Sequence, residues 1–143
     1  MANKMYTIHW NPKVLRTMGG LGRLCLKAIC DEMVFVAMKN APYRTGNLRR
    51  TLGKDILADT SAEVFSTSGY GGYVEFGTGL FGPHHQRIYP TTKKALSWFS
   101  GGMRVAYRST AGMKAQPFMG PAVDDVDRRA GSIIAKEFRE AAA

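Results

Sequence analysis

Apolar residues recur at three- and four-residue steps between residues 14 and 36 and predict a long amphipathic helix. Asn11 and Pro12 form a helix start signal, because the asparagine side chain can cap a backbone N–H and proline's fixed φ suits the first helical position. Pro42 ends the helix, since the residue before a proline is driven out of the helical region. Glycines interrupt the pattern and indicate a kink, a break into two helices or a close helix contact; they are Gly19, Gly20 and Gly22.

Short alternating segments after this helix predict antiparallel strands. Two strands are expected at residues 55–58 and 62–67, on either side of a polar turn. Gly101 and Gly102 separate two runs of strand-forming residues, which predicts a hairpin, with a helix over residues 93–99 as the alternative. A final amphipathic helix is expected to open at Gly120 and Pro121, with acidic residues near its start and basic residues near its end.

The stretch GYGGYVEFGTGLFG, residues 69–82, gathers six glycines around one carboxylate, Glu75. A phosphate-binding loop is one interpretation, but such a loop needs a Lys with a Ser or Thr and a following helix N-terminus, and the sequence has neither here. Glu75 would also repel a phosphate. We therefore interpret the stretch as architecture, with a third strand from Tyr73 to Phe76 that is entered and left through glycines.

The order of these elements predicts a single α+β domain over residues 1–143. We expect an antiparallel sheet, a long N-terminal helix and a C-terminal helix packed on it, and a long loop between strands. Residues 1–10 are expected to form an N-terminal arm. Residues 77–92 are longer than most connections in compact domains, which indicates an extended contact loop.

The formal charge of +9 is unevenly distributed along the chain. Residues 1–54 carry ten Lys or Arg against two acids, a balance of +8, whereas residues 55–143 carry ten against nine. This asymmetry indicates a contact with nucleic acid or an acidic partner, and a solvated helix face is the alternative. A basic patch lies near Tyr43 and consists of Arg44, Arg49, Arg50 and Lys54.

Candidate chemistry is sparse. His84 and His85 are adjacent, but no Cys or carboxylate pair lies nearby at ligand spacing, so neither a metal nor a cofactor is predicted. No catalytic motif is found, and we expect that the protein is not an enzyme. Cys25 and Cys30 are five residues apart on a helix, which favours buried thiols over a disulfide. The chain has no bilayer-length apolar run and no secretory signal, so a cytoplasmic location in the cell that makes it is expected.

Three segments together resemble a known family, the tail-completion or neck proteins of tailed bacteriophages, which include tail components and head-tail joining proteins. APYRTGNLRRTL is similar to the family pattern at Ala41, Pro42, Thr45, Gly46, Leu48 and Arg49. YGGYVEFGTG is similar at Tyr70, Tyr73, Val74, Glu75, Phe76, Gly77 and Thr78. GMKAQPFMGPAV is similar at Gly112, Gln116, Pro117, Phe118, Pro121 and Ala122.

The resemblance implies a structural virion protein, assembled in the host cytoplasm, that forms a homo-oligomeric ring at the head-tail junction. Six copies per ring are expected, with twelve as the alternative, between the portal-side connector and the tail-terminator or tail-tube proteins. It implies no catalytic residue. Neither a cofactor nor a membrane partner is expected. Glu75 is then an inter-element or inter-subunit anchor, paired with an arginine such as Arg49.

The residues expected at the ring interfaces come from the contact loop and the last two motifs: Glu75, Phe76, Phe81, His84, His85, Arg87, Ile88, Tyr89, Pro117 and Phe118. The basic residues Arg44, Arg49, Arg50 and Lys54 would face genomic DNA in the channel or an acidic partner. The alternative function is a small basic protein that binds nucleic acid non-specifically. A zinc enzyme built on the loop histidines is a distant third.

Overall fold

The computed structural model describes residues 3–9, 11, 13 and 20–143. The chain divides into two compact units. The first is the core unit, formed by residues 1–71 and 117–143, and the second is the inserted unit, formed by residues 72–116. Helices and antiparallel sheets together confirm the predicted α+β class. That residues 1–143 form a single domain stays a prediction.

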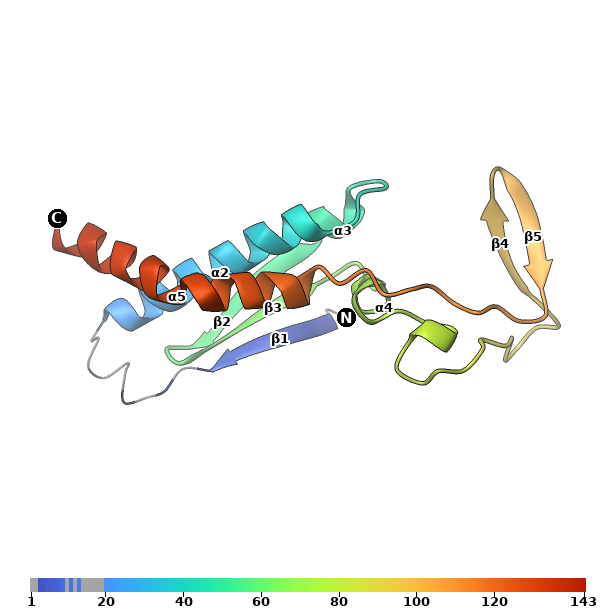
Figure 1. Cartoon of the computed structure of the whole chain (residues 1–143), viewed down its shortest axis with the longest axis horizontal. Helices are drawn as coiled ribbons and strands as arrows, with labels where there is room; N and C mark the ends of the chain where they lie inside the picture. Colours follow the sequence, from blue (N-terminus) through green and yellow to red (C-terminus); the bar gives the residue numbers. More distant parts are fainter. Residues whose placement is uncertain (1–2, 10, 12, 14–19) are drawn as a thin grey trace. The chain divides into compact units, whose positions relative to one another are not determined.

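The core unit contains a three-stranded antiparallel sheet with the strand order β1-β3-β2 (Figure 1). Its strands are β1 (Asn3–His9), β2 (Leu52–Ala58) and β3 (Ser61–Ser66). The central strand β3 pairs with both neighbours, so that Ala62 lies opposite Ile8 on one side and Ile56 on the other. The two strands predicted for residues 55–58 and 62–67 are therefore confirmed as β2 and β3.

The third strand comes from a different part of the chain than predicted. Tyr73–Phe76 is not a strand but part of a short helix, α4 (Gly71–Phe76), and β1 supplies the third strand of the sheet from within residues 1–10. The backbone N–H of Gly77 donates to the carbonyl of Tyr73 at 2.9 Å, and Gly77 has a φ of +77°. A glycine in this left-handed conformation is a common helix stop, and it ends α4 here.

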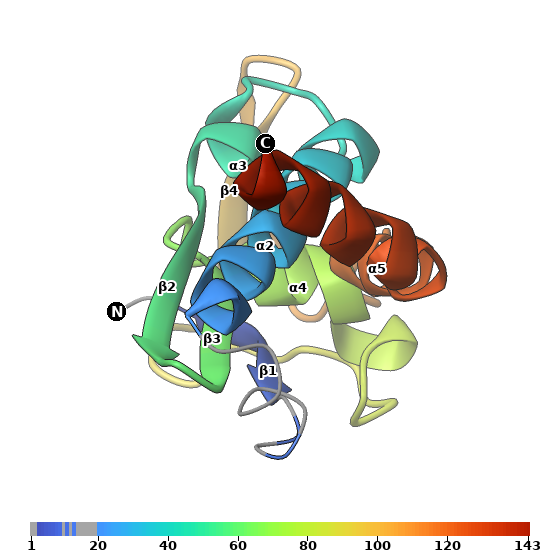
Figure 2. The ribbon, with the colours of Figure 1, turned by 90° about the vertical axis from the view of Figure 1, so that its left-hand side faces the viewer.

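Two long helices accompany the sheet. Helix α2 (Leu21–Asn40) packs against β2 and β3, and α5 (Met119–Ala142) lies alongside α2 (Figures 1 and 2). Helix α2 ends at Asn40, before Pro42, as the sequence predicted. Helix α5 begins at Met119, one residue before the predicted start at Gly120.

The predicted start of the long helix falls partly outside the described residues. The side-chain Oδ1 of Asn11 accepts a hydrogen bond from the backbone N–H of Lys13 at 2.9 Å, which is the contact expected of a cap. Pro12 and residues 14–19 lie outside the described part of the chain. Helix α2 itself begins at Leu21, directly after Gly20.

The interior of the core unit is built where α2 meets the sheet. Leu26, Cys30 and Ala62 are fully buried there, and Ile8 and Ile56 pack against them. Phe118, directly before α5, and the first turns of that helix add further buried side chains, which in the helix are Met119, Ala122 and Val126. Cys25 and Cys30 are buried and free, as the sequence predicted. None of the described helices is long and apolar enough to cross a membrane.

Burial also changes the acidity of one thiol. It raises the pKa of Cys30 from its ordinary value near 9.0 to about 11, with Asp31 adding to the rise and Lys54 opposing it. The folded state therefore favours the neutral thiol. This contribution to stability is complete below pH 9 and is lost as the pH rises towards 11.

We expect that Cys30→Ala will lose less stability than the parent chain between pH 9 and 11. The difference should be on the order of 2 kcal/mol, because each pKa unit corresponds to about 1.4 kcal/mol. Urea unfolding at a series of pH values would measure it. Equal losses in both proteins would contradict the prediction.

The inserted unit contains a second, two-stranded sheet. Strands β4 (Leu96–Ser100) and β5 (Met103–Tyr107) pair in an antiparallel register with Gly101 and Gly102 in the turn, which confirms the predicted hairpin. Residues 77–92 precede it and contain one short 3-10 helix, η1 (Gly79–Phe81).

Candidate assembly surfaces

The structure brings two segments of the inserted unit together along their backbones. The N–H of Thr78 donates to the carbonyl of Met113 at 2.9 Å, and the N–H of Leu80 donates to that of Ala111 at 2.8 Å. The side chain of Thr78 accepts a third bond, from the N–H of Met113, at 2.9 Å. The second and third motifs of the family resemblance thus meet in space. Their amide groups are used within the chain, which agrees with the architectural interpretation of the glycine-rich stretch.

Gly112 allows this close backbone approach. It has a φ of +90°, and a Cβ atom placed on it would lie 2.2 Å from the carbonyl oxygen of Thr78. A side chain at this position would therefore meet both an unfavourable conformation and a fixed backbone atom. Gly101, in the hairpin turn, also has a positive φ of +59°, but a Cβ there would meet no heavy atom within 4 Å.

We expect Gly112→Ala to destabilise the inserted unit by more than about 2 kcal/mol. Backbone strain of about 1–3 kcal/mol adds to the steric clash at this position. Gly101→Ala is the matched control, since it introduces the strain without the clash. Hydrogen exchange of the Thr78 and Leu80 amides would measure the difference. Equal protection in the two variants would show that the clash is relieved at little cost.

The predicted interface residues divide into an exposed and a buried set. The exposed ones are Phe76, Phe81, His84, His85, Arg87, Ile88, Tyr89 and Pro117. Glu75 and Phe118 are buried, with 4% and 0% of their surface exposed. Phe118 is therefore a core residue of the described chain, and its expected place at a ring interface stays a prediction. The role of Glu75 as an anchor stays a prediction.

The contact loop is held at several points within the inserted unit. Ile88 exchanges two backbone hydrogen bonds with Thr110, and the guanidinium of Arg87 donates to the hydroxyl of Ser109 at 3.2 Å. His85 has a φ of +50°, and its Nδ1 lies 3.2 Å from the carbonyl oxygen of Leu80. Within the described part of the chain, no group of three or more His, Cys, Asp or Glu is placed to hold a metal ion.

The predicted basic patch is only partly available for binding. Arg49, in the short helix α3 (Asn47–Arg50), donates two hydrogen bonds to the carbonyl of Ala41 and lies over the ring of Tyr43. Lys54 forms an ion pair with Asp31. The exposed members of the patch are Arg44 and Arg50.

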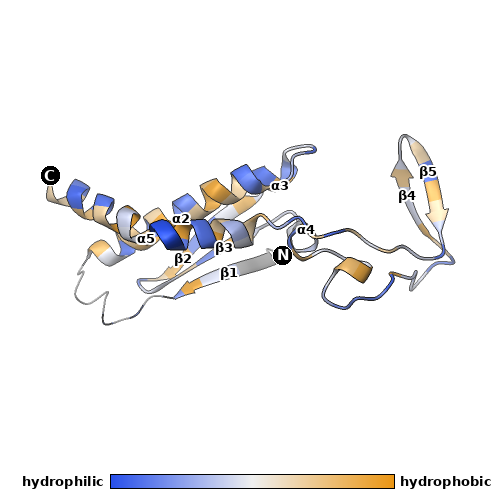
Figure 3. Ribbon diagram, viewed as in Figure 1, coloured by the Kyte–Doolittle hydropathy of each residue, from blue (hydrophilic) through white to orange (hydrophobic). Residues whose placement is uncertain are grey.

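The hairpin carries an apolar surface that the sequence did not identify as a contact site. The strand register places five apolar side chains on one face, namely Leu96, Trp98, Met103, Val105 and Tyr107. The rings of Trp98 and Tyr107 stack with their centroids 5.1 Å apart. Figure 3 shows hydrophobic residues along both strands, and most of them are exposed. The alternating pattern predicted the hairpin, but only the structure shows that Trp98, Met103 and Tyr107 stay exposed within the inserted unit, whereas Leu96 and Val105 are half-buried.

The inserted unit is also strongly basic. It has six Lys or Arg, at positions 87, 93, 94, 104, 108 and 114, against the single acid Glu75, which gives a net charge of +5. All six basic side chains are exposed, whereas the carboxylate of Glu75 is buried. The positive surface charge of the chain is therefore not confined to residues 1–54.

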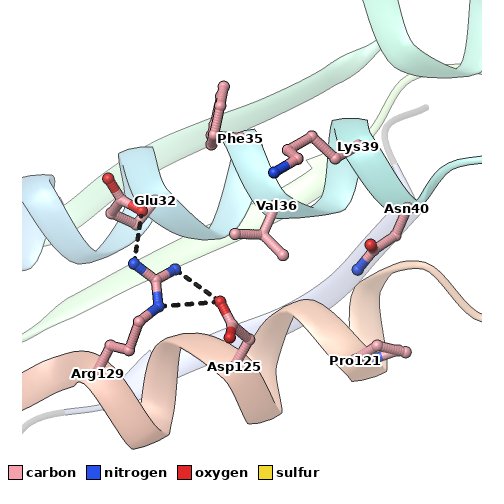
Figure 4. A pocket seen from close by; sticks show the side chains of 8 residues that line it. All are labelled: Glu32, Phe35, Val36, Lys39, Asn40, Pro121, Asp125 and Arg129. Atoms are coloured by element: carbon pink, nitrogen blue, oxygen red, sulfur yellow. Dashed lines mark hydrogen bonds and ion pairs between the residues drawn. The ribbon is translucent and has the colours of Figure 1, made fainter.

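A polar groove of about 470 Å³ lies between α2 and α5 in the core unit (Figure 4). Arg129 extends across it and donates to the Asp125 carboxylate at 2.6 and 3.0 Å and to Glu32 of the opposite helix at 3.2 Å. The hydrogen bonds that Arg129 donates to Asp125, supported by the one to Glu32, raise the pKa of Arg129 and keep the guanidinium charged. The cluster joins the two helices, and its three groups satisfy one another.

We expect Arg129→Ala to lower the Tm of the chain more than Arg128→Ala does. Arg129 bridges two helices, whereas Arg128 is exposed and lies 3.8 Å from Asp125 of its own helix. Thermal unfolding at low and high salt would compare the variants. Identical Tm values would show that the bridge adds nothing to the packing of α2 on α5.

The fold is α+β, and the exposed aromatic, Met and Arg side chains of the inserted unit are typical of protein contact surfaces. Residues 22–77 match the model of a protein family described as "Bacteriophage HK97-gp10, putative tail-component". The match runs from α2 through β2 and β3 to the end of α4, and over this segment it confirms the resemblance to phage tail components. No curated protein and no solved structure matches the chain.

Proposed function

We propose that this chain is a non-enzymatic structural protein of a tailed bacteriophage virion that forms a ring at the head-tail junction. In this role it completes the tail or neck between the portal-side connector and the tail-terminator or tail-tube proteins. The family match over residues 22–77 carries the assignment to the phage tail. The ring and its position at the head-tail junction go beyond this match and are our proposal.

The exposed surface of the inserted unit supports self-association. Large apolar side chains in the loop and hairpin are well exposed, among them Phe81, Tyr89, Phe99 and Met103. Exposure on this scale is a liability for a monomer and is ordinary in a closed interface between subunits. A ring of six copies fits a junction between a symmetric connector and a tail tube, with twelve as the alternative.

Disruption of the gene in the source phage tests the proposal. We expect filled heads and finished tails to accumulate separately in electron micrographs of the lysate, and a plasmid copy to restore joined particles. Normal virions from the disrupted phage would overturn the assignment to the junction. Native mass spectrometry of the purified chain, alone and with connector particles, would give the copy number.

A second function, non-specific binding of nucleic acid, is favoured by the six exposed basic residues of the inserted unit. For binding of this kind, the logarithm of the binding constant falls linearly with the logarithm of the salt concentration. The slope is set by the number of phosphates contacted. Titration of labelled duplex DNA at several salt concentrations would detect it. In the ring, those of the six that lie outside the contacts between copies would face DNA in the channel or an acidic neighbouring protein.

A further inference from the structure

A small apolar groove opens on the core unit between β1, α2 and α5. Its volume is about 170 Å³, and Ile29, Met33 and Val126 form its buried part. Tyr6 lines it from β1, and the exposed carboxylate of Asp127 lies among its lining residues. An apolar cavity of about 150 Å³ is large enough to bind benzene, so this groove has room for one phenyl ring.

The hairpin of the inserted unit presents a ring of that size. Phe99 is 75% exposed and lies directly opposite Arg104 in the register of β4 and β5. The two side chains share a face, and the Nη2 of Arg104 donates to the hydroxyl of Ser97 on the same face at 3.2 Å. One face of the hairpin, near its turn, therefore carries both an exposed phenyl ring and a cation.

We propose that Phe99 of one copy inserts into the groove of a neighbouring copy, with Arg104 paired to Asp127. The groove matches the ring in size and polarity, and the carboxylate among its lining residues matches the cation beside the ring. An isolated two-stranded hairpin is marginally stable in water, and this contact would stabilise it. The inference rests on the self-association in the proposed function and names the residues that carry it.

The contact joins two different surfaces of the same chain. Such a heterologous contact repeats from copy to copy and closes into a ring when the rotation between copies fits. Each copy offers one hairpin and one groove, so every hairpin in a closed ring is occupied.

A photo-reactive benzoylphenylalanine at position 99, in particles assembled from a complementing plasmid copy, tests the contact. We expect a cross-linked species with the mass of two chains on a denaturing gel, with its peptide mapped to β1, α2 or the first half of α5. A cross-linked monomer would overturn the proposal in favour of docking within one chain. A dimer mapped to other peptides would overturn this contact and leave the ring intact, whereas particles without the protein would overturn the proposed function itself.

Charge reversal tests the pairing of Arg104 with Asp127. Arg104→Asp and Asp127→Arg are each expected to lower the yield of cross-linked dimer about tenfold, and the two together should restore it. Arg108→Asp and Asp124→Arg are the matched controls, because both positions are exposed and neither lines the groove nor faces Phe99 in the register. Loss of the dimer without recovery in the double variant, in chains with parental circular dichroism, would remove the charge pair from the proposal.

Discussion

Replacing Phe118 by alanine is expected to lower the free energy of unfolding by about 3–5 kcal/mol, the usual cost of truncating a buried phenyl ring. Phe118 is the largest of the fully buried side chains and immediately precedes α5. Its loss would leave a cavity where α5 begins and would remove apolar surface that folding takes out of water. Guanidinium unfolding followed by circular dichroism at 222 nm would measure the change.

Phe99→Ala is the control for Phe118→Ala, since the two residues differ in exposure and not in chemistry. Phe99 is 75% exposed, and its truncation should change stability by less than about 0.5 kcal/mol. Assembly should show the opposite order, with Phe99→Ala defective although fully folded. A stable Phe118→Ala chain that fails to assemble would support the interface role that the resemblance implies for Phe118.

Leu26→Ala should destabilise the core unit by about 2–5 kcal/mol, because Leu26 is fully buried and its cavity would be closed in by packed neighbours. Leu26 lies in the cluster where α2 meets β3, with Cys30 and Ala62. Leu24, two residues earlier on the same helix, is 48% exposed and provides the matched control. Its replacement by alanine should cost less than about 1 kcal/mol, since little surface leaves water there.

Urea unfolding of the Leu24 and Leu26 variants, with hydrogen exchange of the β3 amides, would compare the two positions. We expect Leu26→Ala to speed exchange along β3, because the cluster joins that strand to α2. Similar losses in both variants would mean that the face of α2 turned to the sheet had been assigned incorrectly.

The parts of the fold that local patterns determine could be predicted from the sequence. Gly101 and Gly102 between alternating runs gave the hairpin, and the apolar spacing after Pro121 gave α5. In both segments the residues that decide the structure are neighbours along the chain. Pro42 likewise ended α2 through a clash with its immediate predecessor.

The wrong strand assignment shows where such patterns fail. Tyr, Val and Phe favour strands on average, but the segment Tyr73–Phe76 is four residues long and its neighbours decide its structure. Gly77 stops a helix as readily as it leaves a strand, and the sequence does not distinguish the two. The pairing of β1 with β3 joins residues more than fifty positions apart, which no local pattern reports.

The sequence could not predict which side chains of the candidate surfaces are exposed and which are buried. Phe118 and Phe99 are both aromatic residues within apolar segments, and only the three-dimensional packing makes one a core residue and leaves the other on the surface. The same applies to the basic patch, where Arg49 binds Ala41, eight positions away, and Lys54 binds Asp31, 23 positions away.

The order in which the chain crosses between its two units has a consequence during synthesis. The core unit needs α5, yet α5 is made only after the whole inserted unit. At about 5–20 residues per second, roughly 70 residues delay it by several seconds, and the nascent chain exposes the face of α2 that α5 will cover. A ribosome that stops before Pro117 therefore releases a product that lacks α5 and leaves that face of α2 uncovered.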